Sequence, residues 1–260
     1  MIMEMFHDFL PHFFIVFVRI GSFVVFVPFF NNSAFIVFIK VGFVLAMTFL
    51  LLPILPLGSW SVPVSLIGFT LILAGEAMVG LLTGFVFLAA LTSLELLGQM
   101  VGFQMAFAMA RALDPAMREQ KNLISVVLIF LGVYLFIVFG GDRYLLKTLA
   151  ESFAILEPGT MVVGEKVLGQ MVRLLQAAFI AGLRLASPLI LVLLAVDLTL
   201  GIIGKTSQKM QIFFVGLPLK VGLGLIGLTM LVDFVRALWS GEALLISERA
   251  AELFAMLKGS

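Results

Sequence analysis

Residues 123–140 read LISVVLIFLGVYLFIVFG, a run without a single charged side chain. A helix that crosses the hydrocarbon core of a bilayer needs about 20 mostly apolar residues. Further stretches of similar character lie near residues 9–30, 34–56, 62–93, 171–203 and 212–239. The pattern predicts an all-α integral membrane protein of about six long hydrophobic helices, arranged as hairpins.

The composition of the whole chain agrees with that prediction. Of 260 residues, 62% are hydrophobic and 12% are charged, and the mean hydropathy is +1.23. Soluble domains are about half apolar and a quarter charged, so membrane lipid is the expected surroundings. The net charge of +1 argues against a nucleic-acid partner, which requires a clustered basic face. The absence of cysteine excludes disulfides, thiolate metal sites and cysteine nucleophiles.

Several features subdivide the apolar stretches. Pro28, Pro63, Pro188 and Pro218 predict breaks, because proline removes a backbone hydrogen bond that neighbouring helices must then replace. Two polar segments, residues 95–122 and 141–170, are expected to be connections between helices. The N-terminal residues carry Glu4 and Asp8 without an early Lys or Arg. We therefore expect the first stretch to be retained rather than cleaved as a signal peptide.

Isolated charges occur inside all but one of the apolar stretches. A charged group at the centre of a membrane helix costs about 2.5–3.5 kcal/mol. Such groups therefore pair and face protein or water. Arg184 and Asp197 are separated by about 20 Å along one helix, at 1.5 Å per residue, so they cannot neutralise each other. The expected buried structural charges, with partners on other helices or subunits, are Arg19, Lys40, Glu76, Arg184, Asp197, Lys220 and Asp233.

Three explanations of these charges remain open at this stage. They can be paired inside a helical assembly, they can lie in segments that partner proteins shield from lipid, or they can form a proton or ion relay. Pairs of small residues at a spacing of four favour close helix packing, in particular Gly80 with Gly84 and Gly98 with Gly102. Together with the isolated charges they predict an oligomer.

Sequence signatures of catalysis are missing. The chain contains no HExxH, GxSxG, phosphate-binding or dinucleotide-binding motif. Its only histidines, His7 and His12, lack further ligands of the usual kind for a metal. We predict a protein that is not an enzyme and holds no metal or other cofactor.

A segment rich in methionine and phenylalanine begins near Gln99 and runs into the charged Asp114-Pro115 stretch. Methionine fills irregular gaps with a deformable side chain. One interpretation is the end of a helix packed into the core. The other is a compliant seal over a passage. The residues assigned to this pore plug or gating loop are Phe103, Met105, Phe107, Met109, Arg111 and Met117.

Several short motifs resemble the FliR family (FliR/SctT) of the type III secretion export apparatus. The clearest run from Asp197 to Gly201 and from Gln211 through Gly216 and Pro218 to Lys220. Others follow in the family's order: Arg19-Ile-Gly21, Gly75-Glu76 with Gly80, Gly98-Gln99 with Gln104, Asp114-Pro115, and Glu157-Pro158-Gly159. Where the family has Pro-Gln after the fifth stretch, this chain has Gln208-Lys209.

The resemblance implies a non-catalytic subunit of a flagellar protein-export gate in the bacterial inner membrane, at the flagellar basal body. Its implied partners are FliP-like, FliQ-like and FlhB-like subunits in a helical hetero-oligomer, and exported, unfolded flagellar proteins are its cargo. Residues 1–170 correspond to a FliP-like part and residues 171–260 to a FliQ-like hairpin and tail. The alternatives are an injectisome export-gate subunit and, in a different class, a proton-coupled secondary transporter. An inverted repeat, which would favour a transporter, is not visible.

Overall fold

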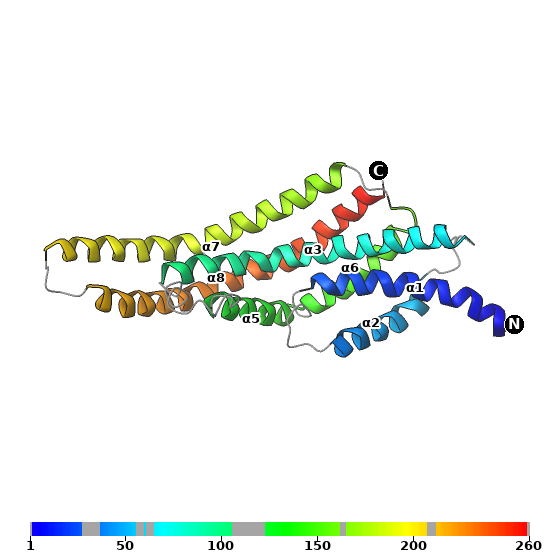
Figure 1. The fold of residues 1–260 in the computed structure, drawn as a ribbon, viewed down its shortest axis with the longest axis horizontal. Coiled ribbons are helices and arrows are strands. Elements are labelled where there is room, and N and C mark those ends of the chain that lie inside the picture. The colour runs from blue at the N-terminus through cyan, green and yellow to red at the C-terminus, as the bar shows by residue number, and fades with distance from the viewer. Residues whose placement is uncertain are drawn as a thin grey trace. The chain divides into compact units, whose positions relative to one another are not determined.

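The described part of the chain, in a computed structural model, comprises residues 2–27, 37–55, 60, 65–105, 123–161, 165–206 and 212–258. Within these ranges every regular element is helical (Figure 1). The elements are α1 (Ile2–Phe26), α2 (Val37–Leu51), the short 3-10 helix η1 (Leu52–Ile54), α3 (Leu66–Gln104), α5 (Leu123–Val138), α6 (Gly141–Ile155), α7 (Glu165–Thr206) and α8 (Ile212–Leu257). The predicted all-α fold is confirmed.

The predicted spans correspond to helices that are long and apolar enough to cross a membrane. Five such helices are present among the described residues, or six if the bent pair α5 and α6 counts as one span. The apolar windows are Phe9–Phe26, Val37–Ile54, Leu66–Gln104, Val167–Lys205 and Val215–Val232. Each window overlaps one of the stretches expected from hydropathy.

Three sequence-based expectations about breaks are wrong in detail. Helix α3 continues to Gln104, through the first ten positions of the segment expected to be a polar connection from residue 95 onward. Its buried residues keep the helical spacing through that region, at Leu94, Leu97 and Val101. Helices α7 and α8 also run on through Pro188 and Pro218. One proline removes one hydrogen bond and does not by itself end a long packed helix. The expected breaks at Pro28 and Pro63 lie outside the described residues.

The second segment expected to be a connection contains a helix of its own. Helix α6 is amphipathic: its buried residues are at helical spacing and include Leu145, Leu149 and Phe153. Asp142, Arg143, Lys147 and Glu151 interleave with them, which gave the segment its polar appearance. Gly140, with φ of +74°, occupies the left-handed region between α5 and α6, where the pair bends by 74°.

The described chain divides into two compact units, each built from segments distant in sequence. Unit 1 contains residues 1–89, 140–174 and 243–260, and unit 2 contains residues 90–139 and 175–242. This division cuts across the FliP-like and FliQ-like parts, because α3, α7 and α8 each contribute to both units. The correspondence of residues 1–170 and 171–260 to FliP-like and FliQ-like proteins stays a prediction.

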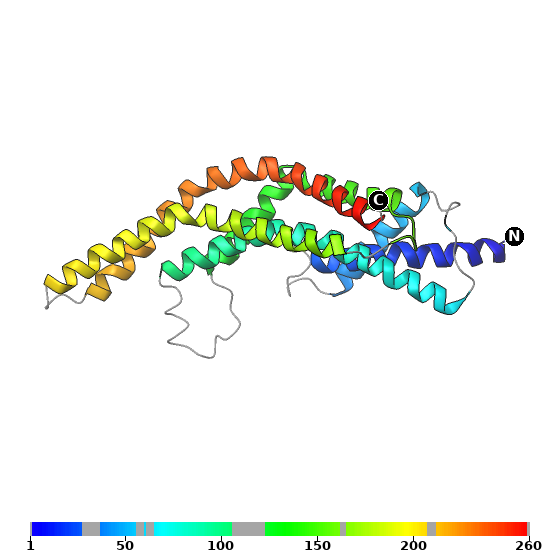
Figure 2. The same cartoon turned by 90° about the horizontal axis from the view of Figure 1, so that it is seen from above.

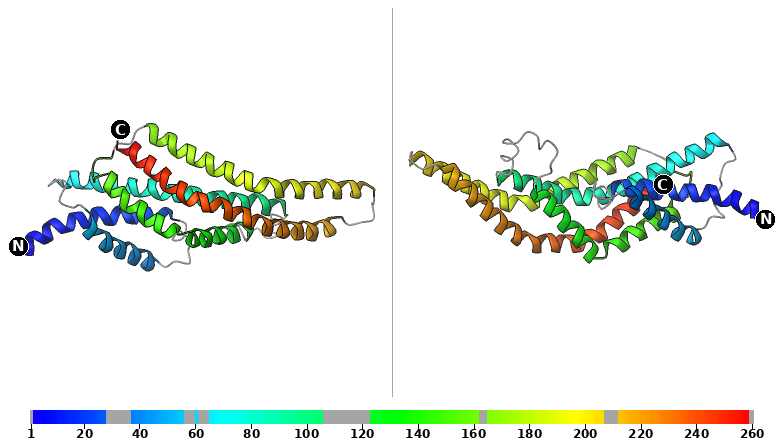
Figure 3. Two further views of the ribbon diagram at one scale, coloured as in Figure 1. Left: turned by 180° about the vertical axis from the view of Figure 1, so that it is seen from behind. Right: turned by 60° about the horizontal axis from the view of Figure 1, so that its bottom comes forward.

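Unit 1 has a core shared by its three segments. The end of α8 lies beside the start of α7 (Figure 3), where Gln170 donates a hydrogen bond to Glu252 with a distance of 3.2 Å. Around them is a cluster of apolar residues from α3, α7, α8 and the turn after α6: Val79, Leu82, Leu156, Val167, Ala250, Leu253, Phe254 and Leu257. Helices α1 and α2 also pack together, with the Phe13 and Phe49 rings 5.4 Å apart.

Unit 2 contains an antiparallel hairpin of α7 and α8 (Figure 2). A Cβ atom added to Gly216 would lie 2.8 Å from Leu200, and one added to Gly227 would lie 3.4 Å from the Leu189 Cγ. Residue numbers that increase along α8 therefore face residue numbers that decrease along α7, as they do in an antiparallel pair of helices. Gly182 brings α7 equally close to the Ser93 carbonyl of α3, at 2.8 Å from an added Cβ. In lipid, helices gain little from the hydrophobic effect when they associate, so they depend on close packing, which glycine permits by letting two backbones approach.

Candidate functional site

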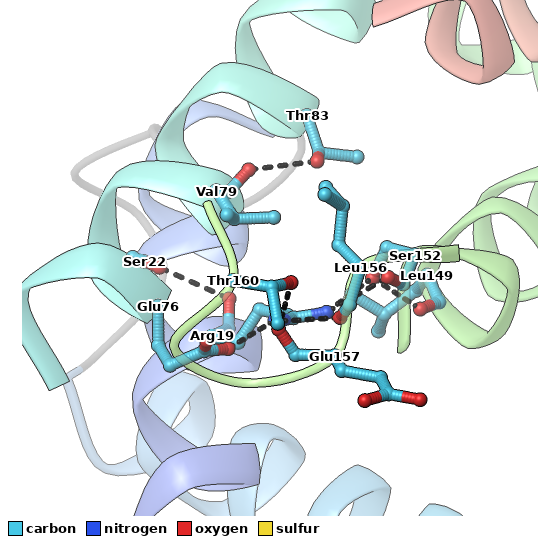
Figure 4. Close-up of polar contacts among 10 residues, drawn as sticks. All are labelled: Arg19, Ser22, Glu76, Val79, Thr83, Leu149, Ser152, Leu156, Glu157 and Thr160. Carbon is cyan, nitrogen blue, oxygen red and sulfur yellow. Dashed lines mark hydrogen bonds and ion pairs between the residues drawn. The ribbon is translucent and has the colours of Figure 1, made fainter. Parts of the chain in front are cut away.

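Among the described residues, the largest buried polar side chain in unit 1 is that of Arg19 on α1. Arg19 and Glu76 of α3 form an ion pair through Nε and Oε2, and each side chain is 1% exposed (Figure 4). The same guanidinium donates to the Ser152 carbonyl at 2.9 Å and to the Leu156 carbonyl at 3.1 Å, at the end of α6. Its Cζ lies 4.1 Å from the centre of the Phe153 ring. We call these five residues the Arg19 node.

Two glycines on α3 explain why Glu76 reaches Arg19. Gly80 and Gly84 follow Glu76 at intervals of four, so the three residues share one face of α3. A Cβ atom added at Gly84 would lie 2.7 Å from the Phe23 carbonyl, and one added at Gly80 would overlap the Arg19 carbonyl and the Ser22 hydroxyl. The α1 and α3 backbones are therefore in direct contact, and the carboxylate one turn away points at α1.

The Arg19 node holds a charge and does not relay one. Arginine does not deprotonate in proteins, so its guanidinium cannot take part in stepwise proton transfer. All three of its nitrogens have acceptors within unit 1, including the Ser152 hydroxyl at 3.4 Å. A desolvated charge with this many partners is suited to joining helices, in this case α1, α3 and α6.

A second polar cluster lies in unit 2, at the end of α3. Lys220 of α8 and Asp197 of α7 form an ion pair, with side-chain exposures of 15% and 38%. Gln104, the last residue of α3, donates to Asp197 at 3.0 Å, and the carbonyl of Gln104 accepts from Lys220 at 3.4 Å. The Asp197–Lys220 pair therefore connects the end of α3 to α7 and α8.

The first residues of the expected seal segment have opposite environments. Phe103 is 70% exposed, whereas Met105 is fully buried within unit 2. A Cβ atom added to Gly224 of α8 would lie 2.6 Å from the Met105 Cε, so this glycine leaves the space that the methionine fills. Met105 thus packs as part of a helix end, which was one of the two interpretations of the segment. Phe107, Met109, Arg111 and Met117 lie outside the described residues.

The remaining expected structural charges differ from Arg19 and Glu76. Lys40 on α2 is partly exposed, and Arg184 on α7 is exposed. Arg184 lies on an outward face of α7 beside the exposed Leu183, so its burial, which was expected against other helices or other subunits, stays a prediction. Asp233 lies within α8, where its side chain is outside the described set.

The sequence did not reveal the polar partners that belong to α6. Arg19 is 133 residues from Ser152 and 137 from Leu156, and it contacts their backbone carbonyls, which carry no sequence signal. Phe153 could have been found, since it lies on the buried face of the amphipathic α6. Among the described residues no group of three or more His, Cys, Asp or Glu side chains is placed to hold a metal ion.

The profile of the family described as "Bacterial export proteins, family 1" matches residues 10–244. The chain belongs to this family. The matched range contains the Arg19 node, the Asp197–Lys220 pair and the whole expected seal segment of this export protein.

Individual relatives are similar over most of their length. The flagellar biosynthetic protein FliR of Pectobacterium carotovorum is 28% identical over 228 residues, which is 88% of this export protein and 87% of that relative. FliR of Bacillus subtilis is 26% identical and covers 88% of each chain. The secretion system apparatus protein SsaT of Salmonella typhimurium is 25% identical and covers 64% of each.

Removal of the cation in the unit 2 cluster is expected to have a modest effect. In Lys220→Met, Asp197 loses its ion pair but remains 38% exposed and keeps the hydrogen bond from Gln104. Partly exposed pairs contribute up to about 1 kcal/mol. Thermal aggregation of the detergent-solubilised chain should therefore begin only slightly earlier than in the parent. Complete loss of folded protein would mean that Lys220 has a larger role than its exposure indicates.

Proposed function

We propose that this export protein is a non-catalytic subunit of a flagellar type III protein-export gate in the bacterial inner membrane. The observation that carries the proposal is the family match over residues 10–244, together with relatives named FliR that align over nearly their full length. The apolar helices supply the membrane part of such a gate. The Arg19 node has the chemistry of a structural joint, which suits a subunit that holds a passage and performs no reaction.

The proposed partners are FliP-like and FliQ-like subunits, with an FlhB-like subunit docked to them and unfolded flagellar proteins as cargo. Support comes from the many apolar side chains left on the surface of the single chain. Only 17% of the Val167–Lys205 window and 17% of the Val215–Val232 window are buried. Helix α7, with 42 residues, is about 63 Å long at 1.5 Å per residue, roughly twice the thickness of the hydrocarbon core of a bilayer. The hydrocarbon core of the bilayer is too thin to cover the whole of α7, whereas apolar helices of partner subunits can cover the rest.

The decisive experiment is to tag the chain at its own locus, solubilise native membranes in mild detergent and identify what co-purifies. We expect FliP-like and FliQ-like proteins in fixed proportion, and loss of motility and of exported flagellar proteins when the gene is deleted. Recovery of the chain as a stable, monodisperse monomer from native membranes would contradict the proposal.

An injectisome subunit is the second candidate, favoured by the similarity to SsaT. The deletion strain separates the two. Loss of filament and hook proteins from the medium, with other secretion intact, assigns the flagellar system. The reverse pattern assigns the injectisome.

We further propose that the segment beyond Met105 closes the passage by apolar contact. Because Gln104 and Met105 are held within unit 2, a deletion that tests this should begin after them. Removal of residues 106–113 is expected to leave assembly intact and to admit small solutes, measured as uptake of a labelled ion. Met109→Asp should also leak, because a carboxylate hydrates an apolar constriction.

The matched control for the seal is Met109→Leu, which keeps volume and polarity nearly constant and should stay tight. If the deletion destroys assembly, the segment contributes to core packing and the seal idea is lost. If the complex assembles and stays tight, closure lies elsewhere in the complex.

A further inference from the structure

Basic side chains in the last turn usually stabilise the C-terminus of a helix. The last turn of α6 contains no basic residue. The exposed carbonyls at a helix end carry partial negative charge and need donors. Ser152 already accepts from the Leu156 amide at 3.0 Å. The additional donors for Ser152 and Leu156 both come from Arg19, on a different helix.

Arg19 thus supplies the cation, two donors and a flat surface to one helix end. Its guanidinium lies against the Phe153 ring with a distance of 4.1 Å, in the geometry of a cation–π contact. Glu76 holds Nε from the opposite side, which orients the two terminal nitrogens toward α6. The carboxylate therefore positions the guanidinium as well as neutralising it.

The other end of α6 has the features of a hinge. Gly140 precedes α6 in the left-handed region, with φ of +74°, and no side chain caps the helix there. After α6, Gly159 also has a positive φ, of +82°. The outward face of α6 carries the exposed Lys147–Glu151 pair, with a distance of 3.6 Å, which interacts with solvent whether α6 is docked or not.

We propose that Arg19 is a latch for α6: the helix is docked on unit 1 through Arg19 and separates from it as one piece when the latch is removed. The Arg19 node supplies the interhelical hydrogen bonds to the end of α6, and the glycines at both ends let the segment move without melting α1 and α3. This inference does not depend on the protein's being an export-gate subunit.

The chain contains no native cysteine, so single cysteines report local opening without interference. Thr148→Cys is the reporter, because Thr148 lies on the docked face of α6, is fully buried and has no hydrogen-bond partner for its hydroxyl among the described residues. Lys147→Cys replaces a side chain that is 65% exposed, so it gives the thiol-labelling rate of an accessible position on α6. Leu94→Cys, fully buried in unit 2, reports whether the rest of the chain stays folded.

The experiment measures the rate of N-ethylmaleimide labelling in native membranes, with the full chain expressed beside its natural partners. A thiol reacts as the thiolate, which requires contact with water. In the parent chain, Thr148→Cys and Leu94→Cys should both be protected. Arg19→Met alone would leave the Glu76 carboxylate buried without a cation, so Glu76→Met is introduced with it and both buried charges are removed together. In this double variant, labelling at position 148 should rise by about tenfold or more, in proportion to the open population, and labelling at 94 should not change.

Arg19→Lys is the conservative variant. It keeps the charge but loses the planar fork that reaches two carbonyls at once, so labelling at position 148 should fall between the parent and the double variant Arg19→Met/Glu76→Met. Protection of position 148 in Arg19→Met/Glu76→Met would overturn the latch. Labelling of positions 94 and 148 together would also overturn it, because Arg19 would then support the whole fold and not α6 alone.

Discussion

Glu76→Gln is expected to remove most of the folded protein from the membrane. The substitution keeps the shape of the side chain but leaves the Arg19 charge, which is 1% exposed, without an anion. Breaking a buried ion pair by removing one partner costs about 3–5 kcal/mol. Native proteins are stable by about 5–15 kcal/mol in total, so this loss is a large fraction. The measurement is the amount of chain recovered in the purified complex and the temperature at which that complex aggregates.

The chain provides a matched control for this substitution. Glu151→Gln makes the same chemical change at an exposed pair, where Lys147 and Glu151 are 65% and 42% exposed. Exposed pairs contribute up to about 1 kcal/mol, so recovery should be close to that of the parent. Equal recovery of the Glu76→Gln and Glu151→Gln variants would show that the buried pair contributes no more than a surface pair.

The second large effect is expected for Gly80→Ala. The added methyl group would overlap the Arg19 carbonyl and the Ser22 hydroxyl and would lie 3.0 Å from the Phe23 amide nitrogen. Overpacking costs about 1–3 kcal/mol, and the upper end applies where backbone atoms oppose the methyl and cannot rotate away. Because α1 must move away from α3, the Arg19–Glu76 ion pair should weaken too.

Gly75→Ala tests the same change on the same helix without the collision. An added Cβ there has nothing within 4 Å. Alanine is also the better helix former, by about 1 kcal/mol. The thermal aggregation temperature should therefore fall for Gly80→Ala and stay constant or rise for Gly75→Ala. Similar falls for both variants would indicate a general intolerance of α3 to alanine and not a close approach to α1.

The parts of this protein that were predictable from sequence are those encoded locally. The uninterrupted apolar run at residues 123–138 identified a helix, although α5, with 16 residues, is long enough for a span only together with the bent α6. Gly80 and Gly84 indicated a helix contact through their spacing, and the structure places that contact between α3 and α1. Isolated charges marked Arg19 and Glu76 as groups in need of partners. Their mutual pairing, across 57 residues, depends on which helices meet and could not be read from either motif.

The errors came from reading polarity as a sign of connection. Helix α6 has charged residues on one face and buried ones on the other, so its mean polarity hid an amphipathic helix. The end of α3 was missed for the same reason, although Leu94, Leu97 and Val101 continue its buried face. Arg184 is a different case: the apolar run around it predicted burial with partners on other helices or subunits, and its exposure in the single chain does not test that prediction.

The discontinuous composition of unit 1 has a consequence for the order of events during biosynthesis. Residues 1–89 cannot complete their core until Ala250, Leu253 and Phe254 have been made, because these residues are fully buried in it. Ribosomes add about 5–20 residues per second, so Val79 and Leu82 of α3 wait on the order of ten seconds or more for their contacts with α8. Such high contact order slows folding. The first helices of this protein must therefore remain in the bilayer without their final packing partners until the last residues have been made. A ribosome that stalls before residue 250 leaves a product in which residues 1–89 cannot form their complete core.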